Sequence, residues 1–416
     1  MIAEDQSILQ LMADRKAGRL AQARAQRRLA VGTIAVVLSV CAFGTTALTP
    51  APPSPGAGER PMAQWASLRL PPPVPQAPAP LAAQIAALGA AFDGRAGIAV
   101  RDLEGGWTAT HDGEALYPQQ SVSKLWVAIS VLDAVDRGVL RLSDPVTVRR
   151  EDLSIFHQPI RDHVGRYGYR TTVGDLLSSA ASRSDNAAND VLIRLVGGPD
   201  HVRAVMAERE LGAISLADEE RYFQTAIAGL DWRPEFSFGR NFWRARAAMP
   251  QDERRAALEA YLSAPADGAT PAAVVQALDR LAAGDLLSED STALLLDLLG
   301  RSQTGPDRLA GGLVEGWRLA HKTGTGQVLG ARATGYNDVG LLTAPDGRTY
   351  AVAVFIADTT RPVPERQALM QAVTRAVIAQ HHGHDPRQSA SEDFNLLPLA
   401  GQEAADLKLR GDFPAP

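Results

Sequence analysis

The stretch SVSKLWVAISVLDAV, residues 121–135, combines a short polar motif with an apolar repeat. Its apolar side chains recur at helical spacing, which predicts a buried helix that begins at Ser121. They belong to Val122, Leu125, Trp126, Ile129, Leu132 and Val135. In the first turn of a helix, the side chains of Ser121 and Lys124 project from one face, so the amine is able to take the proton of the hydroxyl. Taken alone, the motif is as typical of a helix cap followed by a solvated lysine.

Two further motifs follow along the chain. Ser184-Asp185-Asn186 lies between helices that the apolar pattern predicts at residues 173–181 and 187–196. Lys322-Thr323-Gly324 ends an apolar strand predicted at residues 317–322. Helix capping and a turn at the end of a strand are the alternative interpretations of these two motifs. The ordered set of three is more specific than any one of its members.

In order and separation, the three motifs resemble the S-x-x-K, S-D-N and K-T-G elements of the penicillin-recognising serine hydrolases, most closely the class A β-lactamases. The resemblance extends over residues 81–385. It implies that Ser121 is the nucleophile, that Lys124 helps to take its proton, and that Ser184 relays a proton to the departing nitrogen. It also implies that Asn186 holds the amide side chain of the substrate and that Asp185 braces the loop.

The resemblance also implies which residues bind the substrate. These are Lys322, Thr323, Gly324 and Thr325, with the first two on the substrate carboxylate. The backbone N–H groups of Ser121 and Thr325 would form the oxyanion hole, and the glycine would let substrate approach the strand closely. Arg332 is a candidate for a second carboxylate contact.

The main departure from the class A pattern lies between the second and third motifs. Class A enzymes carry an E-x-x-L-N element there, whose glutamate activates the water that clears the acyl-enzyme, and this string does not occur in the chain. The available carboxylates are Glu219, Glu220 and Glu235. Counted onward from Asn186, Glu220 stands about where the glutamate is needed, although a solvated acid is the simpler interpretation of all three. The sequence therefore leaves the deacylation step open.

The ends of this region predict strands, and its middle predicts helices. A helix at 81–92 and a hairpin at 97–103 and 107–111 come first; strands at 317–322, 338–343 and 349–358 and a helix at 365–381 come last. We expect an α+β fold, an α/β sandwich whose antiparallel sheet is built from both ends of the domain with a helical subdomain inserted. Residues 232–267, rich in aromatic side chains, read as an insertion. An amphipathic helix in it suits packing on the domain, which we favour, and covering the cleft equally.

Outside the catalytic region, the sequence predicts a membrane tether. Residues 1–28 form a basic leader, and the apolar residues 29–48 are long enough to span a bilayer. The positive charge before this segment places the leader in the cytoplasm and the catalytic domain in the periplasm, with a cleaved signal peptide as the alternative. Residues 49–80 form a linker rich in Pro and Ala, and residues 386–416 form a polar tail.

The net charge and the single cysteine exclude some classes of partner and of chemistry. The net charge of −5 argues against nucleic acid as a partner, and the single cysteine, Cys41, lies in the apolar N-terminal segment, away from the three motifs. We expect a serine hydrolase that opens β-lactam amides through an acyl-enzyme, without metal or organic cofactor. Its partner would be a β-lactam or a small molecule derived from peptidoglycan. A penicillin-binding D,D-peptidase-like enzyme and a non-catalytic, membrane-tethered binding module or sensor are the alternatives.

Overall fold

The computed structural model describes residues 75–383, and its main sheet is antiparallel. The strand order is β2-β1-β10-β9-β7, with β8 paired to β9. These strands are β1 (Arg95–Asp102), β2 (Thr108–His111), β7 (Arg318–Thr325), β8 (Val328–Leu329), β9 (Arg332–Thr343) and β10 (Thr349–Thr359). Because β1 pairs with β10, the sheet is assembled from both ends of the described chain, and the predicted α+β fold is confirmed.

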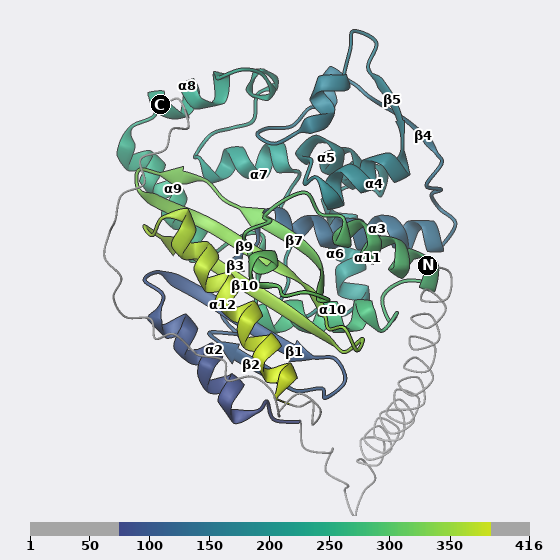
Figure 1. Ribbon diagram of the computed structural model, residues 1–416. Helices are drawn as coiled ribbons and strands as arrows, with labels where there is room; N and C mark the ends of the chain where they lie inside the picture. The colour runs from purple at the N-terminus through teal and green to yellow at the C-terminus, as the bar shows by residue number, and fades with distance from the viewer. Residues whose placement is uncertain (1–74, 384–416) are drawn as a thin grey trace, which may run out of the picture. The chain divides into compact units, whose positions relative to one another are not determined.

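The alternation of side chains along β1 and β10 gives the sheet two apolar faces. Ile98 lies opposite Val354, and both pack in one cluster with buried side chains of α2 and α12. The next pair, Ala99 and Ala353, belongs to the cluster on the other face, where α10 packs. These helices are α2 (Ala79–Ala91), α10 (Pro271–Ala282) and α12 (Val363–His382). Figure 1 shows α12 lying across the strands.

The middle of the chain is mainly helical, as expected. Its α-helices are α3 (Lys124–Asp136), α4 (Val173–Ser182), α5 (Asn186–Leu195), α6 (Pro199–Glu208), α7 (Glu220–Ile227), α8 (Asn241–Ala248), α9 (Gln251–Ser263) and α11 (Glu289–Gly300). Short two-stranded sheets join β3 (Tyr117–Pro118) to β6 (Gly268–Ala269) and β4 (Pro145–Val148) to β5 (Tyr169–Thr172). Single 3-10 turns are η1 (Gln120–Ser123), η2 (Arg150–Asp152), η3 (Pro159–His163), η4 (Pro234–Ser237) and η5 (Leu309–Gly312).

The α-helix that was predicted to begin at Ser121 begins three residues later. Ser121 lies in the 3-10 turn η1, and α3 starts at Lys124. Gln120, directly before the serine, has a φ of 53°, a conformation that costs free energy for any residue with a side chain. Its N–H donates a 2.6 Å hydrogen bond to the carboxylate of Asp267, which helps to hold the turn in this conformation.

Several predictions about the ends of the chain fall outside the described residues. These are the leader at 1–28, the transmembrane anchor at 29–48, the linker up to residue 74 and the tail at 386–416. From residue 75 to residue 383, no helix combines the length and the apolar character needed to cross a membrane. Helix α2 begins at Ala79, so the last two residues of the predicted linker are already helical.

Candidate active site

Ser121 and Lys124 meet at the start of α3. The Lys124 Nζ atom donates a 2.8 Å hydrogen bond to Ser121 Oγ, as the spacing of the motif predicts. The lysine is 1% exposed, so a solvated lysine is the wrong interpretation of this motif. A buried ammonium needs a charged partner, and the carboxylate of Glu220 provides one through a direct contact from Oε1 to Lys124 Nζ.

Glu220 is the first residue of α7, and Asp190 on α5 holds it in place. The backbone N–H groups of Glu220 and Arg221 donate hydrogen bonds of 2.6 and 3.2 Å to the Asp190 carboxylate. Burial, together with the nearby Glu220 and Glu219 carboxylates, raises the pKa of Asp190 well above its usual range. Because Glu220 is 3% exposed and paired with Lys124, the interpretation of this residue as a solvated acid is wrong.

The other two candidate glutamates lie in different surroundings. Glu219 is buried and accepts hydrogen bonds from the guanidinium groups of Arg194 and Arg221. Glu235 is exposed, as expected for a solvated acid. The sequence signal for Glu220 was present but altered: Phe223 and Gln224 stand where the leucine and asparagine of E-x-x-L-N would be.

A second buried lysine meets the S-D-N motif. Lys322 Nζ donates a 2.8 Å hydrogen bond to Ser184 Oγ and a 3.0 Å hydrogen bond to the carbonyl of Thr323. Burial lowers the pKa of Lys322 well below its usual value, and the cations of Lys124 and Arg308 add repulsion. Ser184 has a φ of 60°, so this serine sits in a left-handed turn next to α5.

The rest of the S-D-N motif has both a capping role and a bracing role. Asp185 is the N-cap of α5 and accepts a 3.0 Å hydrogen bond from the N–H of Ala188. Its second oxygen accepts a 2.6 Å hydrogen bond from the N–H of Ile160, which ties a separate loop to the motif. Asn186 donates from Nδ2 to the carbonyl of Ile155 at 2.9 Å.

Gly324 in the third motif is required by the packing of β7 against the segment before Ser121. A Cβ atom at this position would lie 2.2 Å from the carbonyl oxygen of Gln119, closer than two such atoms can approach. The missing side chain therefore makes room for protein backbone, whereas we expected it to make room for substrate. Beside it, Thr323 Oγ1 shares a 2.6 Å hydrogen bond with Thr304 Oγ1.

Arg308, a residue that the sequence did not single out, lies at the end of β7. Its guanidinium donates to the carbonyl of Gly324 at 2.8 Å and to Thr325 Oγ1 at 2.6 Å, and its central carbon lies 3.8 Å from the centre of the Tyr336 ring. By contrast, Arg332 forms ion pairs with Asp358 and Glu259. We therefore expect Arg308 rather than Arg332 to be the second cation near the substrate carboxylate, because Arg332 joins β9 to β10 and α9.

The inserted segment, residues 232–267, packs on α7 as expected. Leu258, Tyr261 and Leu262 of α9 form a buried cluster with Phe223 and Ile227 of α7. The Tyr261 hydroxyl also reaches the residue next to Ser121, because it accepts a 2.6 Å hydrogen bond from Gln120 Nε2.

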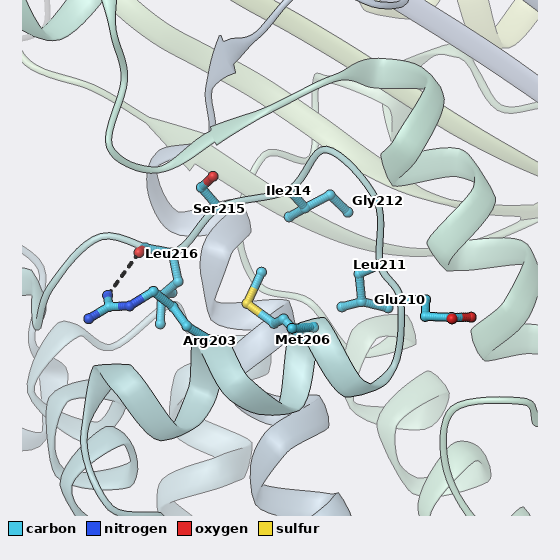
Figure 2. A pocket seen from close by; sticks show the side chains of 9 residues that line it. Arg203, Met206, Glu210, Leu211, Gly212, Ile214, Ser215 and Leu216 are labelled. Atoms are coloured by element: carbon cyan, nitrogen blue, oxygen red, sulfur yellow. Dashed lines mark hydrogen bonds between the residues drawn. The ribbon is translucent and has the colours of Figure 1, made fainter. Parts of the chain in front are cut away.

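A cavity of about 370 Å³ lies elsewhere, between α6 and residues 210–216, and contains none of the motif residues. Figure 2 shows Met206 and Leu211 in its wall and Arg203 hydrogen-bonded to the carbonyl of Leu216. Within residues 75–383, no three His, Cys, Asp or Glu side chains are grouped as ligands for a metal ion.

A serine hydroxyl, two buried lysines, a second serine and a carboxylate thus converge between α3, α5, α7 and β7, as in serine hydrolases that form an acyl-enzyme. The protein-family model for the β-lactamase enzyme family matches residues 80–381. The chain belongs to this family and is a serine β-lactamase-like hydrolase.

Named relatives and solved structures agree with this assignment. The chain is 27% identical to β-lactamase VEB-1 of Pseudomonas aeruginosa over 65% of this chain and 79% of the relative. It is 29% identical to the extended-spectrum β-lactamase PER-1 of the same species over 62% and 73% of the two chains. The crystal structure of a β-lactamase from Chitinophaga pinensis superposes with a TM-score of 0.60 at 28% identity, covering 73% of this chain and 99% of that one.

Proposed function

We propose that this protein hydrolyses β-lactams in two chemical steps, with Ser121 as nucleophile and Glu220 as the base of the second step. The observation that carries the proposal is the position of Lys124: its amine contacts the Ser121 hydroxyl on one side and the Glu220 carboxylate on the other. A nucleophile and a base within reach of one amine are what acylation followed by hydrolysis requires.

In the first step, Ser121 Oγ attacks the lactam carbonyl and its proton passes to the Lys124 and Glu220 pair. The backbone N–H groups of Ser121 and Thr325 stabilise the oxyanion. The carbon–nitrogen bond of the ring then breaks, and the nitrogen takes the proton of the Ser184 hydroxyl. The proton that the Lys124 and Glu220 pair took from Ser121 returns to Ser184 Oγ, so the Glu220 carboxylate is free again for the second step. Lys322 donates to Ser184 Oγ and stabilises the negative charge that develops on this oxygen.

Substrate binding uses the groups around these residues. The carboxylate of the substrate is held by Lys322, Thr323, Thr325 and the cation of Arg308, while Asn186 binds the amide side chain. Because Arg308 donates to Thr325 Oγ1, its guanidinium lies next to the carboxylate position.

In the second step, Glu220 removes a proton from a water molecule, which attacks the ester carbonyl on Ser121. The carbon–oxygen bond to Ser121 breaks, and the oxygen recovers its proton from the same pair of Lys124 and Glu220. The penicillin-binding alternative was favoured by the missing E-x-x-L-N string, and the contact of Glu220 with Lys124 removes that reason.

Intact-mass measurement and product assay with a penicillin test the proposal on the purified full-length protein. We expect the wild type to release many products per molecule, Ser121→Ala to form neither adduct nor product, and Glu220→Gln to stop at one stable adduct. Glu235→Gln, a neutralised exposed glutamate, is the matched control and should turn over like the wild type. A persistent adduct on the wild type would establish the penicillin-binding alternative, and the absence of both adduct and product would leave the binding module.

The location of the protein is a further part of the proposal. Residues 29–48 anchor the chain in the inner membrane with the catalytic domain in the periplasm, which is supported by the basic residues before the apolar segment. Membrane fractionation after a carbonate wash tests the anchor, and the mass of the N-terminal peptide tests it against a cleaved signal peptide. Recovery of the protein in the soluble periplasmic fraction, beginning after residue 48, contradicts the anchor.

A further inference from the structure

A chain of buried polar side chains joins the inserted segment to Glu220. It begins at Asp267, whose Oδ1 accepts a 2.9 Å hydrogen bond from the Tyr261 hydroxyl. Gln120 Nε2 donates to the Tyr261 oxygen at 2.6 Å. Gln224 Nε2 then donates to Gln120 Oε1 at 2.9 Å and to Glu220 Oε2 at 3.1 Å. None of these five residues is more than 7% exposed, so water does not readily replace any partner.

The direction of each hydrogen bond in this chain is set by the one before it. When Asp267 is ionised, its carboxylate takes the only proton of the Tyr261 hydroxyl, so the tyrosine oxygen has only acceptor capacity left for Gln120. The NH₂ group of Gln120 must therefore face Tyr261, and its oxygen faces Gln224. This leaves Gln224 with its NH₂ group toward Glu220, where a carboxylate needs a donor. Gln327 Nε2 favours the same orientation, because it donates to Gln224 Oε1 at 3.3 Å.

The position of Tyr261 in the fold makes it the origin of this order. Tyr261 lies on α9, and its ring packs against the ring of Phe223 on α7, with 5.7 Å between the ring centroids. Figure 1 shows α7 and α9 near each other. The hydroxyl, by contrast, is hydrogen-bonded to Gln120 and Asp267, neither of which lies on α7. Packing and positioning are thus carried by different parts of one side chain.

We propose that Tyr261 is a positioning residue for Glu220, which acts through Gln120 and Gln224 to hold the carboxylate in the orientation that activates the deacylating water. The inference rests on the proposed function, in which Glu220 is the base of the second step. Tyr261 itself touches neither substrate nor the reacting atoms.

Loss of the tyrosine oxygen has a defined effect on this chain. Without it, the buried NH₂ group of Gln120 has no acceptor, and only the bond from Gln224 still orients this amide. A Gln120 side chain that is free to shift no longer holds the Gln224 amide in a fixed position beside Glu220. Glu220 then keeps its contact with Lys124, while its second partner is no longer fixed. Acylation uses Ser121 and the contact of Lys124 with Glu220, which is kept, so acylation is retained; deacylation, which needs the carboxylate held toward the water, slows.

The test uses Tyr261→Phe in the purified full-length protein, which removes the oxygen and keeps the ring. We expect the deacylation rate of a chromogenic cephalosporin to fall at least about tenfold, the loss of one hydrogen bond to a charged group. The acylation rate, from rapid mixing, should stay within about threefold, and intact mass should show the acyl-enzyme accumulating during turnover. Tyr169→Phe is the control, because Tyr169 lies in β5, its ring stacks on His163, and it takes no part in the chain of hydrogen bonds.

A double-variant cycle shows whether the effect passes through Gln224. If it does, Tyr261→Phe combined with Gln224→Leu deacylates no more slowly than Gln224→Leu alone. If Tyr261→Phe fails to fold, Gln120→Met interrupts the chain at the next link and should give the same selective loss of deacylation. Equal losses in acylation and deacylation, or no loss, overturn the inference while the proposed function stands. A wild type that forms no acyl-enzyme overturns both.

Discussion

The amine of Lys322 donates a 2.8 Å hydrogen bond to the hydroxyl of Ser184, which lies 138 positions earlier in the chain. Within residues 75–383, the hydrogen bonds of this amine go to Ser184 and to the carbonyl of Thr323, and none goes to a carboxylate. Burial and two nearby cations lower its pKa well below the ordinary range of lysine. The carboxylates of Glu220 and Asp338 offset this only in part. We therefore expect an anionic substrate to favour the charged form of Lys322 further, so that substrate binding and the protonation of Lys322 depend on each other.

This coupling predicts a difference between two pH profiles. The charge of Lys322 is lost as pH rises through its lowered pKa, so kcat/KM, which reports the free enzyme, should decline at a lower pH than an ordinary lysine would allow. A bound carboxylate raises this pKa, so the decline in kcat should lie at higher pH. Lys322→Arg, which stays charged, should move the decline in kcat/KM upward by at least about one unit. Coincident alkaline limbs for kcat and kcat/KM in the wild type would contradict the coupling.

Replacement of Arg308 should weaken substrate binding more than that of Arg332. Arg308→Ala removes the cation beside Thr325 and should raise KM for a penicillin by about tenfold or more, since a hydrogen bond between charged groups is worth about 1.5–3 kcal/mol. Arg332→Ala is the matched control, because its guanidinium pairs with Asp358 and Glu259. Steady-state kinetics measure both variants, and a larger effect on KM from Arg332→Ala would reverse the assignment.

The sequence predicted the parts of this protein that local patterns determine. Helical spacing after Ser121, the apolar strand before Lys322 and the alternation in residues 349–358 each reflect the burial of one face, so the sheet and most helices could be placed from them. The pairing of Ser121 with Lys124 also follows from helix geometry, because the two residues are three positions apart.

The parts that were missed depend on contacts between distant residues. Arg308 carries no local signal, because its role arises from the packing of residues 305–309 against the end of β7. Glu220 was placed only by counting, since its environment comes from Asp190 on another helix. The 3-10 turn at Ser121 was missed because Asp267, 147 positions away from Gln120, holds it.

Asp267 should make the stability of the fold depend on pH. Burial is the main cause that raises its pKa to about 7, so the folded state binds a proton more tightly than the unfolded chain, whose Asp pKa is about 3.9. The stabilisation is complete below about pH 4 and is lost as pH rises through about 7. Between pH 5 and pH 8 the loss amounts to about 3 kcal/mol. The Asp267→Asn variant has no carboxyl group at this position, so its stability lacks this dependence on pH.

Urea unfolding of the wild type and of Asp267→Asn at several pH values measures this effect. The difference in the free energy of unfolding, wild type minus variant, should decrease steadily from pH 5 to pH 8. Other titrating groups contribute equally to both proteins and cancel in the difference. A difference that stays constant over this range means that the carboxyl of Asp267 does not titrate there.

Phe242, in the inserted segment, should be important for the stability of the fold and for the loop that is hydrogen-bonded to Asn186. It is 2% exposed and packs edge-on against Phe156 at 5.0 Å between ring centroids. Phe156 directly follows Ile155, whose carbonyl accepts the hydrogen bond from Asn186. Phe242→Ala should lower the free energy of unfolding by about 3–5 kcal/mol, the usual cost of removing a buried aromatic ring.

Because this ring supports the loop that holds Asn186, the same variant should raise KM for substrates with a bulky amide side chain more than for those with a small one. Phe242→Leu keeps much of the buried volume and should recover most of the stability. Trp243→Ala is the matched control for stability, since this ring is 46% exposed and its loss creates no closed cavity. Denaturant unfolding and KM for a pair of penicillins that differ only in side-chain size measure both effects. A uniform change in KM for the two penicillins would show that Phe242 stabilises the fold without shaping the pocket at Asn186.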